Sequence, residues 1–113
     1  MRIVNLTRGT ELCSAATMAG DPARRLAGLM FRRGLQPGSA IVLEPCNGIH
    51  TCFMRFPVDV VFISFEWEVL RIAPAVPPWR FIPWVSGSRR VVEMRAGSVA
   101  LSRTAPGDLL SPV

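Results

Sequence analysis

Apolar residues repeat with the period of a helix in only one segment of the chain. Leu26, Leu29 and Met30 recur at spacings of three and four residues, which places them on one stripe of a helical surface. An Asp-Pro pair before this stripe supplies a favourable N-cap and a proline at the first helical position, and Gly34 is placed to end the helix. The pattern therefore predicts one short amphipathic helix over residues 22–33.

Most of the remaining chain consists of short apolar runs bounded by glycine and proline, and these runs are rich in Val, Ile and Phe, as is typical of strands. The expected strands cover residues 11–18, 40–44, 51–56, 59–65, 68–73, 90–95 and 98–101. Glu66 and Trp67 mark the tip of a hairpin. Many short strands with one helix predict a mainly β domain, either a compact β-sandwich of jelly-roll type or a partly closed barrel, with the helix over an open end or edge.

Proline and glycine mark two further segments. Residues 74–88 contain four prolines and cannot form a central strand, because proline donates no ladder hydrogen bond. We expect a long loop there that folds back on the body of the domain, with Trp79 and Trp84 as its anchors. The Pro-Gly-Asp sequence at residues 106–108 predicts a turn that closes the last hairpin, and it suggests no chemistry.

Length and composition predict an ordinary globular protein. A chain of 113 residues, 50% hydrophobic and 19% charged, is expected to form a single domain over residues 1–113 and to be too apolar for disorder. No apolar run approaches the roughly 20 residues of a membrane span, and no signal-peptide pattern opens the chain. Three cysteines, an odd number, favour free thiols and a reduced, cytoplasmic setting.

The net charge of +5 comes from 13 basic residues, all of them arginine. Genomic base composition explains this preference better than function does, because Ala, Gly and Pro are also abundant. The arginines are spread along the chain and are not grouped with stacking aromatic residues, as they more often are in nucleic-acid binders. The sequence therefore favours weak affinity for anions and does not support sequence-specific binding of nucleic acid.

Cys46, His50 and Cys52 form a Cys-x3-His-x-Cys pattern, which offers three soft metal ligands within seven positions. Structural zinc requires four ligands, and neither another cysteine nor a second histidine lies nearby. A nucleophilic pair of Cys52 and His50 is the alternative, but nothing around it resembles a nucleophile elbow. We therefore expect core thiols, no metal or other cofactor, and no catalysis.

Two carboxylates lie in strongly apolar runs, Asp59 after the Pro57 break and Glu93 within a Val-Val-Glu-Met sequence. A carboxylate among such neighbours must reach water or pair with a cation, and Arg24, Arg32 and Arg55 are available. One interpretation is a buried ion pair that fixes strand register. The other is a polar pocket in which arginine and carboxylate groups bind a small ligand. The sequence leaves both open.

An ordered series of short motifs resembles the bacterial and archaeal family called "domain of unknown function 192". Each motif is weak alone, but the series spans about residues 10–110 and is specific in its order. The matching residues are Gly28-Leu29-Met30, Arg32 or Arg33, Leu35, Phe53-Met54-Arg55, Pro57, Asp59, Val60-Val61-Phe62-Ile63, Val92-Glu93, Ala96-Gly97 and Gly107-Asp108.

The chain departs from this family pattern in two places. Residues 53–56 read Phe-Met-Arg-Phe where many members have Trp-Met-Lys-Asn-Thr, and residues 66–68 replace the usual glycine after the central strand. The resemblance implies a small, mainly β, jelly-roll-like domain. It implies no established reaction, cofactor or substrate.

Together these observations predict a binding domain without turnover. We expect a small anionic ligand to contact Arg32, Arg55, Asp59 and Glu93, with His50 at the rim, because arginine binds carboxylate or phosphate bidentately.

An interaction module of a larger bacterial assembly is the alternative function. It would dock through Trp79 and Trp84, or form a homodimer there, because aromatic anchors concentrate interface energy. Exposure of the two indole rings is the observation that distinguishes a docking surface from a cover over the core.

Overall fold

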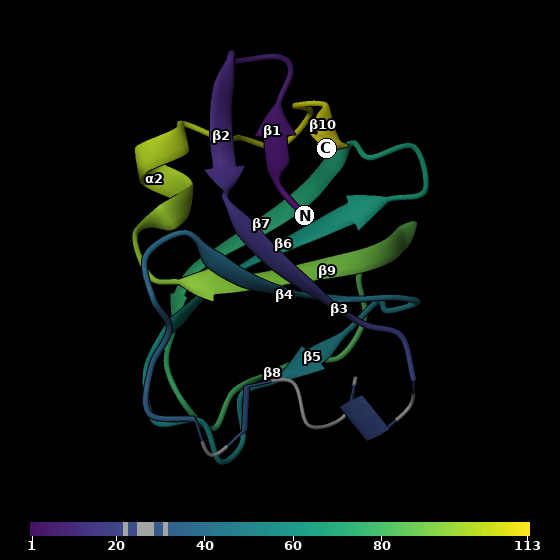
Figure 1. The fold of residues 1–113 in the computed structure, drawn as a ribbon. Helices are drawn as coiled ribbons and strands as arrows, with labels where there is room; N and C mark the ends of the chain where they lie inside the picture. Colours follow the sequence, from purple (N-terminus) through teal and green to yellow (C-terminus); the bar gives the residue numbers. More distant parts are fainter. Residues whose placement is uncertain (22, 25–28, 31) are drawn as a thin grey trace.

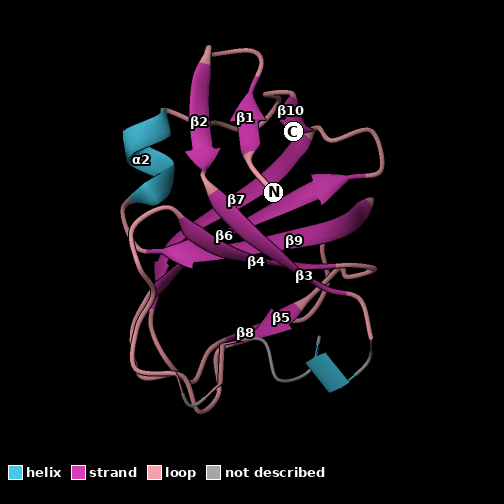
Figure 2. Ribbon diagram, in the orientation of Figure 1, coloured by secondary structure: helices cyan, strands magenta, loops and turns pink. Residues whose placement is uncertain are grey.

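Short strands are the main regular structure of the described chain, which comprises residues 1–21, 23–24, 29–30 and 32–113 of a computed structural model (Figures 1 and 2). The strands are β1 (Ile3–Asn5), β2 (Thr10–Cys13), β3 (Ala15–Ala19), β4 (Ser39–Leu43), β5 (Ile49–His50), β6 (Val58–Ser64), β7 (Val69–Val76), β8 (Phe81–Ile82), β9 (Ser88–Arg95) and β10 (Leu110–Pro112), and the short helix α2 spans Ser98–Ser102.

A five-stranded sheet in the order β3-β4-β9-β6-β7 forms the centre of the molecule. Its pairs are antiparallel except for β3 and β4, which run parallel. Every residue of β6 is buried, and Val61 of β6 lies opposite Val92 of β9. A strand that is covered on both faces is apolar throughout rather than alternating, which explains the continuous apolar run in the sequence.

Apolar clusters cover both faces of this sheet. On one face, Val61 and Met94 pack with Leu12 of β2, Val99 of α2 and Leu110 of β10, so the three-stranded sheet β10-β1-β2 and the helix form a second layer. The other cluster contains Val60, Phe62 and Val91 together with residues of the β5–β8 ribbon and its loops. Figure 1 shows α2 and the ribbon on opposite sides of the sheet.

The predicted fold class is confirmed as mainly β and sandwich-like, and the sheets do not close into a barrel. Much of the helix predicted over residues 22–33 lies outside the described residues. Ala23 and Arg24 are helical and the N–H of Arg24 donates to the predicted cap, Asp21, at 2.8 Å, whereas Leu29 lies in a turn. Within the described part of the chain, no helix is long and apolar enough to cross a membrane.

Two of the predicted strands are wrong. Residues 98–101 form α2, because Gly97 adopts a left-handed φ of 97° and turns the chain out of β9. Residues 51–56 are turns, with a positive φ of 63° at Phe53, and only Ile49–His50 before them pair as a strand. High β propensity did not decide either segment, because hydrogen bonds to distant residues fix their conformation: the Asp59 carboxylate bonds the start of α2, and the backbone of Arg80 bonds Thr51.

The proline-rich segment also differs from the prediction. Strand β7 continues through Pro74 to Val76, which is possible because β7 is an edge strand and needs no donor on its outer side. Trp79 and Trp84 remain 57% and 67% exposed. The two rings therefore do not anchor this loop in the core.

Candidate functional site

Asp59 is a buried carboxylate near the start of β6, and backbone amides surround it. Its Oδ1 accepts a hydrogen bond from the N–H of Ala75 at 2.8 Å, and its Oδ2 accepts from the N–H groups of Gly97 and Val99 at 3.0 Å. Ala75 has a φ of 45° and Gly97 a φ of 97°, so both segments bend sharply where the carboxylate holds them. Asp59 therefore fixes the first turn of α2 and a distortion in β7.

Asp108 has a similar role beside β1. Its Oδ2 accepts hydrogen bonds from the Asn5 amide, the Arg8 guanidinium and the N–H of Ala105, each at 3.0 Å. Burial would raise the pKa of Asp108, but the hydrogen bonds from Asn5, Arg8 and Ala105 outweigh it and hold the pKa below its ordinary value. The turn at residues 106–108 therefore joins α2 to β10 through a structural carboxylate, and sequence reasoning missed this role.

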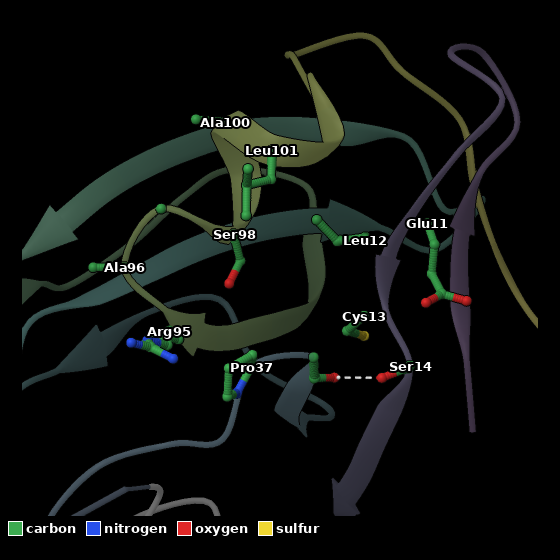
Figure 3. A pocket seen from close by; sticks show the side chains of 12 residues that line it. Glu11, Leu12, Cys13, Ser14, Pro37, Arg95, Ala96, Ser98, Ala100 and Leu101 are labelled. Atoms are coloured by element: carbon green, nitrogen blue, oxygen red, sulfur yellow. Dashed lines mark hydrogen bonds between the residues drawn. The ribbon is translucent and has the colours of Figure 1, made fainter.

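A groove of about 720 Å³ lies between α2 and the corner where β2 leads into β3 (Figure 3). Arg95 and Pro37 form one side of the groove and Glu11 lies on the other, while the Ser98 hydroxyl points into the space between them. Leu101, which also lines it, is 87% exposed. Gly97 also lines this groove. Because Asp59 accepts the N–H groups of Gly97 and Val99, it fixes the backbone on that side of the groove.

The charges at this groove are unbalanced. Glu11 is neutralised by Arg2, whose Nε lies 2.8 Å from its Oε2. Arg95 has no carboxylate partner among the described residues, and with Arg33 it also lines an adjoining hollow of about 510 Å³. Arg32 lines a third hollow of about 270 Å³ in the same region. Arg95 at the groove, with Arg33 and Arg32 at the hollows beside it, forms what we call the arginine rim.

Cys13 lines the same groove but is not suited to nucleophilic chemistry. Burial raises the pKa of its thiol from 9.0 to about 11. Because the thiolate is the reactive form, a thiol with this pKa stays protonated and inert at neutral pH.

The structure does not bring the five predicted ligand residues together. Arg32 and Arg55 are exposed, Asp59 and Glu93 are buried, and the Nδ1 of the half-buried His50 accepts the N–H of Cys52 at 3.2 Å. All five are described, and no hydrogen bond or ion pair joins any two of them. Arg32 belongs to the arginine rim, and Asp59 supports the groove through α2.

Glu93 is 2% exposed in the centre of the sheet, between Ile41 of β4 and Val60 of β6. Its Oε2 has no hydrogen-bond partner. Burial raises the pKa of this carboxyl from 4.5 to about 7. Within the described residues Glu93 thus takes no part in the ion pair that was one interpretation of the sequence.

Arg90 forms a buried ion pair that sequence reasoning missed. It is 4% exposed, and its Nε lies 2.9 Å from Glu44 Oε2. Its guanidinium also donates to the carbonyl of Ser64 at 2.6 Å and lies 4.2 Å from the centre of the Trp67 ring. Since these contacts pin the β6–β7 turn to β9, the arginine has a structural role. In the sequence, the Arg89-Arg90 pair alone does not indicate that Arg90 is buried.

Cys46, His50 and Cys52, the soft ligands of the Cys-x3-His-x-Cys pattern, do not form a cluster in the described structure. Among the described residues the three cysteines form no disulfide, and the Sγ of Cys46 lies 3.0 Å from the carbonyl oxygen of Gly48. In the described portion of the chain, no three His, Cys, Asp or Glu side chains converge as a metal site would require.

Exposed aromatic rings gather at the β5–β8 end of the molecule. Besides the two tryptophans, Phe53 is 47% and Phe81 is 71% exposed. The rings of Phe53 and Trp79 meet edge to face with centroids 4.7 Å apart. A hollow of about 360 Å³ beside them is lined by residues 45–50, Phe81 and Pro83. We call Phe53, Trp79, Phe81 and Trp84 the aromatic end.

These features define a small, mainly β domain with an arginine-rimmed groove beside α2 and an aromatic end at the β5–β8 ribbon. The chain belongs to the family DUF192, described as an uncharacterized ACR, whose model matches residues 3–112. It is 28% identical to a UPF0127 protein of Pyrococcus furiosus over 96% of this chain and 95% of that protein. A UPF0127 protein of Thermococcus sibiricus is 26% identical over 94% of this chain and 71% of its own length.

Two solved structures share the fold. A protein of unknown function from Novosphingobium aromaticivorans superposes with a TM-score of 0.86 at 22% identity, covering 99% of this chain and 84% of that one. A putative transcription regulator from Sinorhizobium meliloti superposes with a TM-score of 0.80 at 24% identity, covering 97% of this chain and 89% of the other. At these identities the likeness concerns the fold alone.

Proposed function

We propose that the protein is a non-catalytic binding module that takes a small anionic ligand in the groove beside α2. The observation that supports this proposal is the Arg95 guanidinium, which faces a concave site and has no carboxylate partner among the described residues. A guanidinium offers two parallel N–H donors to a carboxylate or phosphate. Arg33 and Arg32 add positive potential along the same rim.

The shape and lining of the groove fit a ligand of modest size. Its volume of about 720 Å³ is within the range of roughly 300–1,000 Å³ that is common for small-molecule sites. Leu12, Pro37 and Leu101 offer apolar contacts, while the Ser98 hydroxyl adds a polar group near the centre. A carboxylate attached to a short hydrocarbon or ring would place its charge at Arg95 and its apolar part against the leucines.

Residues that carry the family resemblance build this groove. Ala96 and Gly97 line it, and Asp59 holds the N–H groups at the start of α2. Asp59 is in this proposal a positioning residue that does not touch the ligand. Glu93, like His50 and Arg55, lies away from the groove lining, and a ligand contact at those three stays a prediction.

Amide NMR with benzoate, succinate and inorganic phosphate as probes tests this function. We expect at least one probe to shift the signals of Gly97 and Ser98 in the wild-type protein, and Arg95→Ala to abolish that shift. Arg71→Ala is the matched control, because Arg71 is exposed on β7 and lines none of the hollows at the arginine rim. Unchanged signals around the groove with all three probes would refute the proposal.

A second candidate function is an interaction module that docks through the aromatic end. The exposure of Trp79 and Trp84 favours it, because covered rings could not contact a partner. Large exposed apolar groups that cluster on a small protein often mark interaction surfaces. The groove and the aromatic end are separate, so the two functions are compatible.

A further inference from the structure

We infer that the aromatic end binds an acidic segment of a partner protein. This inference rests on the second proposed function and names the chemistry of the partner. Three observations carry it: the rings are exposed, buried hydrogen bonds hold their loops in place, and the surrounding charge is of one sign.

The composition of this surface is that of a protein interface. Aromatic residues and arginine are enriched at the centres of interfaces, where Asp, Glu and Lys are depleted. Here Trp79, Phe81 and Trp84 are each more than half exposed, and Arg80 lies between two of them in the sequence. Tryptophan and arginine are also the residue types that most often dominate binding energy.

Thr51 holds the two loops of this surface together. It is fully buried, its Oγ1 donates to the carbonyl of Pro77 at 2.7 Å, and that oxygen accepts the N–H of Arg80 at 2.8 Å. Backbone bonds join Thr51 N–H to Arg80 O at 2.9 Å and Trp79 N–H to Thr51 O at 3.1 Å. Because the loops are fixed before binding, little ordering entropy is lost when a partner docks.

A second contact closes the far side of the same surface. The N–H of Val85 donates to the carbonyl of Asn47 at 2.7 Å. A Cβ added at Gly48 would lie 2.3 Å from the carbonyl oxygen of Pro83, so the two backbones meet where only glycine fits. Trp84 therefore stands on a loop that is tied to the floor of the hollow beside Phe81.

The two segments that form this end carry positive charge only. Segments 45–57 and 77–89 contain Arg55, Arg80 and Arg89 but neither aspartate nor glutamate. Within the described residues, Arg55 and Arg80 have no carboxylate partner, and the Nε of Arg89 lies 3.9 Å from Glu44. A partner with complementary charge carries carboxylates.

The geometry favours a protein segment over nucleic acid. The edge-to-face contact between Phe53 and Trp79 covers ring surface that base stacking would use. The hollow of about 360 Å³ between residues 45–50 and Phe81 is concave and suits one apolar side chain of a bound segment. A carboxylate next to that side chain would then meet Arg80, which precedes Phe81 in the chain.

Selection from a phage-displayed library of random 12-residue peptides tests the inference on the intact protein. We expect the enriched peptides to contain more Asp and Glu than the unselected library. Trp84→Ala should weaken the binding of a synthesised enriched peptide roughly thirtyfold, as truncation of an anchoring tryptophan does. Arg80→Gln should weaken it as well, and more so at low salt. Arg103→Gln, exposed after α2, is the matched control and should bind like the wild type.

Other results would overturn the inference in distinguishable ways. Enriched peptides that depend on Trp84 but lack acidic residues would leave the interaction module standing and refute its acidic partner. Peptides that bind Trp84→Ala as tightly as the wild type would refute the docking surface itself, as would failure to enrich any peptide. Binding of a dT20 oligonucleotide or phosphatidylglycerol vesicles in place of peptides, or a dimer that Trp84→Ala dissociates, would show a different occupant.

Discussion

The buried carboxyl of Glu93 makes a specific prediction about stability and pH. Its side chain is 2% exposed between Ile41 and Val60, and burial raises its pKa from 4.5 to about 7. The folded protein therefore holds this proton more tightly than the unfolded chain does. Below pH 4.5 both states are protonated and the stabilising contribution is complete. As the pH rises through about 7 the contribution is lost, because an ionised carboxylate must then stay buried or the protein must unfold.

The size of the effect follows from the interval between the two pKa values. That interval of about 2.5 pH units, at about 1.4 kcal/mol per unit, corresponds to about 3.5 kcal/mol over the whole titration, of which about 3 kcal/mol falls between pH 4.5 and pH 8. Glu93→Gln keeps the shape of the side chain and removes the titration. We therefore expect the free energy of unfolding of Glu93→Gln, relative to the wild type, to rise by about 3 kcal/mol between pH 4.5 and pH 8. In thermal unfolding this is a relative shift of about 12 °C for a domain of this size.

Urea denaturation followed by tryptophan fluorescence, at half-unit steps of pH, measures this difference directly. Comparing each variant with the wild type at the same pH cancels the titration of all other groups. Glu66→Gln is the matched control, because Glu66 is exposed at the β6–β7 turn. The difference in free energy of unfolding between Glu66→Gln and the wild type should be the same at every pH. Parallel pH profiles for the wild type and Glu93→Gln would refute the reasoning, since Glu93 would then titrate alike in both states.

Two further carboxylates have predicted structural effects. Asp59→Asn replaces a carboxylate that accepts three amide N–H groups with a side chain whose NH₂ group points toward them. We expect the free energy of unfolding in urea to fall by about 2–4 kcal/mol, and any anion binding at the groove to be lost. Asp21→Asn is the control, because Asp21 is an exposed carboxylate. If Asp59→Asn unfolds at the same urea concentration as the wild type, the structural role assigned to Asp59 is wrong. Asp108→Asn should cost about 2 kcal/mol at neutral pH, and the gap from the wild type should narrow as the pH falls below 3.8, because the lowered pKa of Asp108 stabilises the fold only while the carboxylate is ionised. A gap that stays constant in acid would show that the charge of Asp108 is not what stabilises β1.

The two candidate surfaces depend on different parts of the fold. The groove beside α2 exists because Asp59 accepts N–H groups from Gly97 and Val99, so its geometry should respond to changes in β6. The aromatic end depends instead on Thr51 and the loops that it joins. Stability changes at one surface are therefore expected to leave binding at the other intact, because sites without shared partners behave independently.

Local patterns in the sequence were sufficient to predict the mainly β fold and the central strands. The apolar run at residues 59–65 became β6, and residues 68–73 and 90–95 lie within β7 and β9. The conformation of such segments is decided by the periodicity and burial of side chains that lie within a few residues of one another in the chain. The same local reasoning failed at residues 98–101, where a carboxylate 38 to 40 positions away in the chain holds the first turn of α2.

Tertiary structure alone decided which residues form the two surfaces. In the sequence the aromatic residues and arginines of the aromatic end lie in two separate segments, 45–57 and 77–89, and folding brings these segments together through the buried hydroxyl of Thr51. Arg95 likewise gains its place in the groove from the contact of α2 with β2. Periodicity reports which face of an element is buried, but it carries no information on which distant segments meet. That depends on the packing of the whole chain.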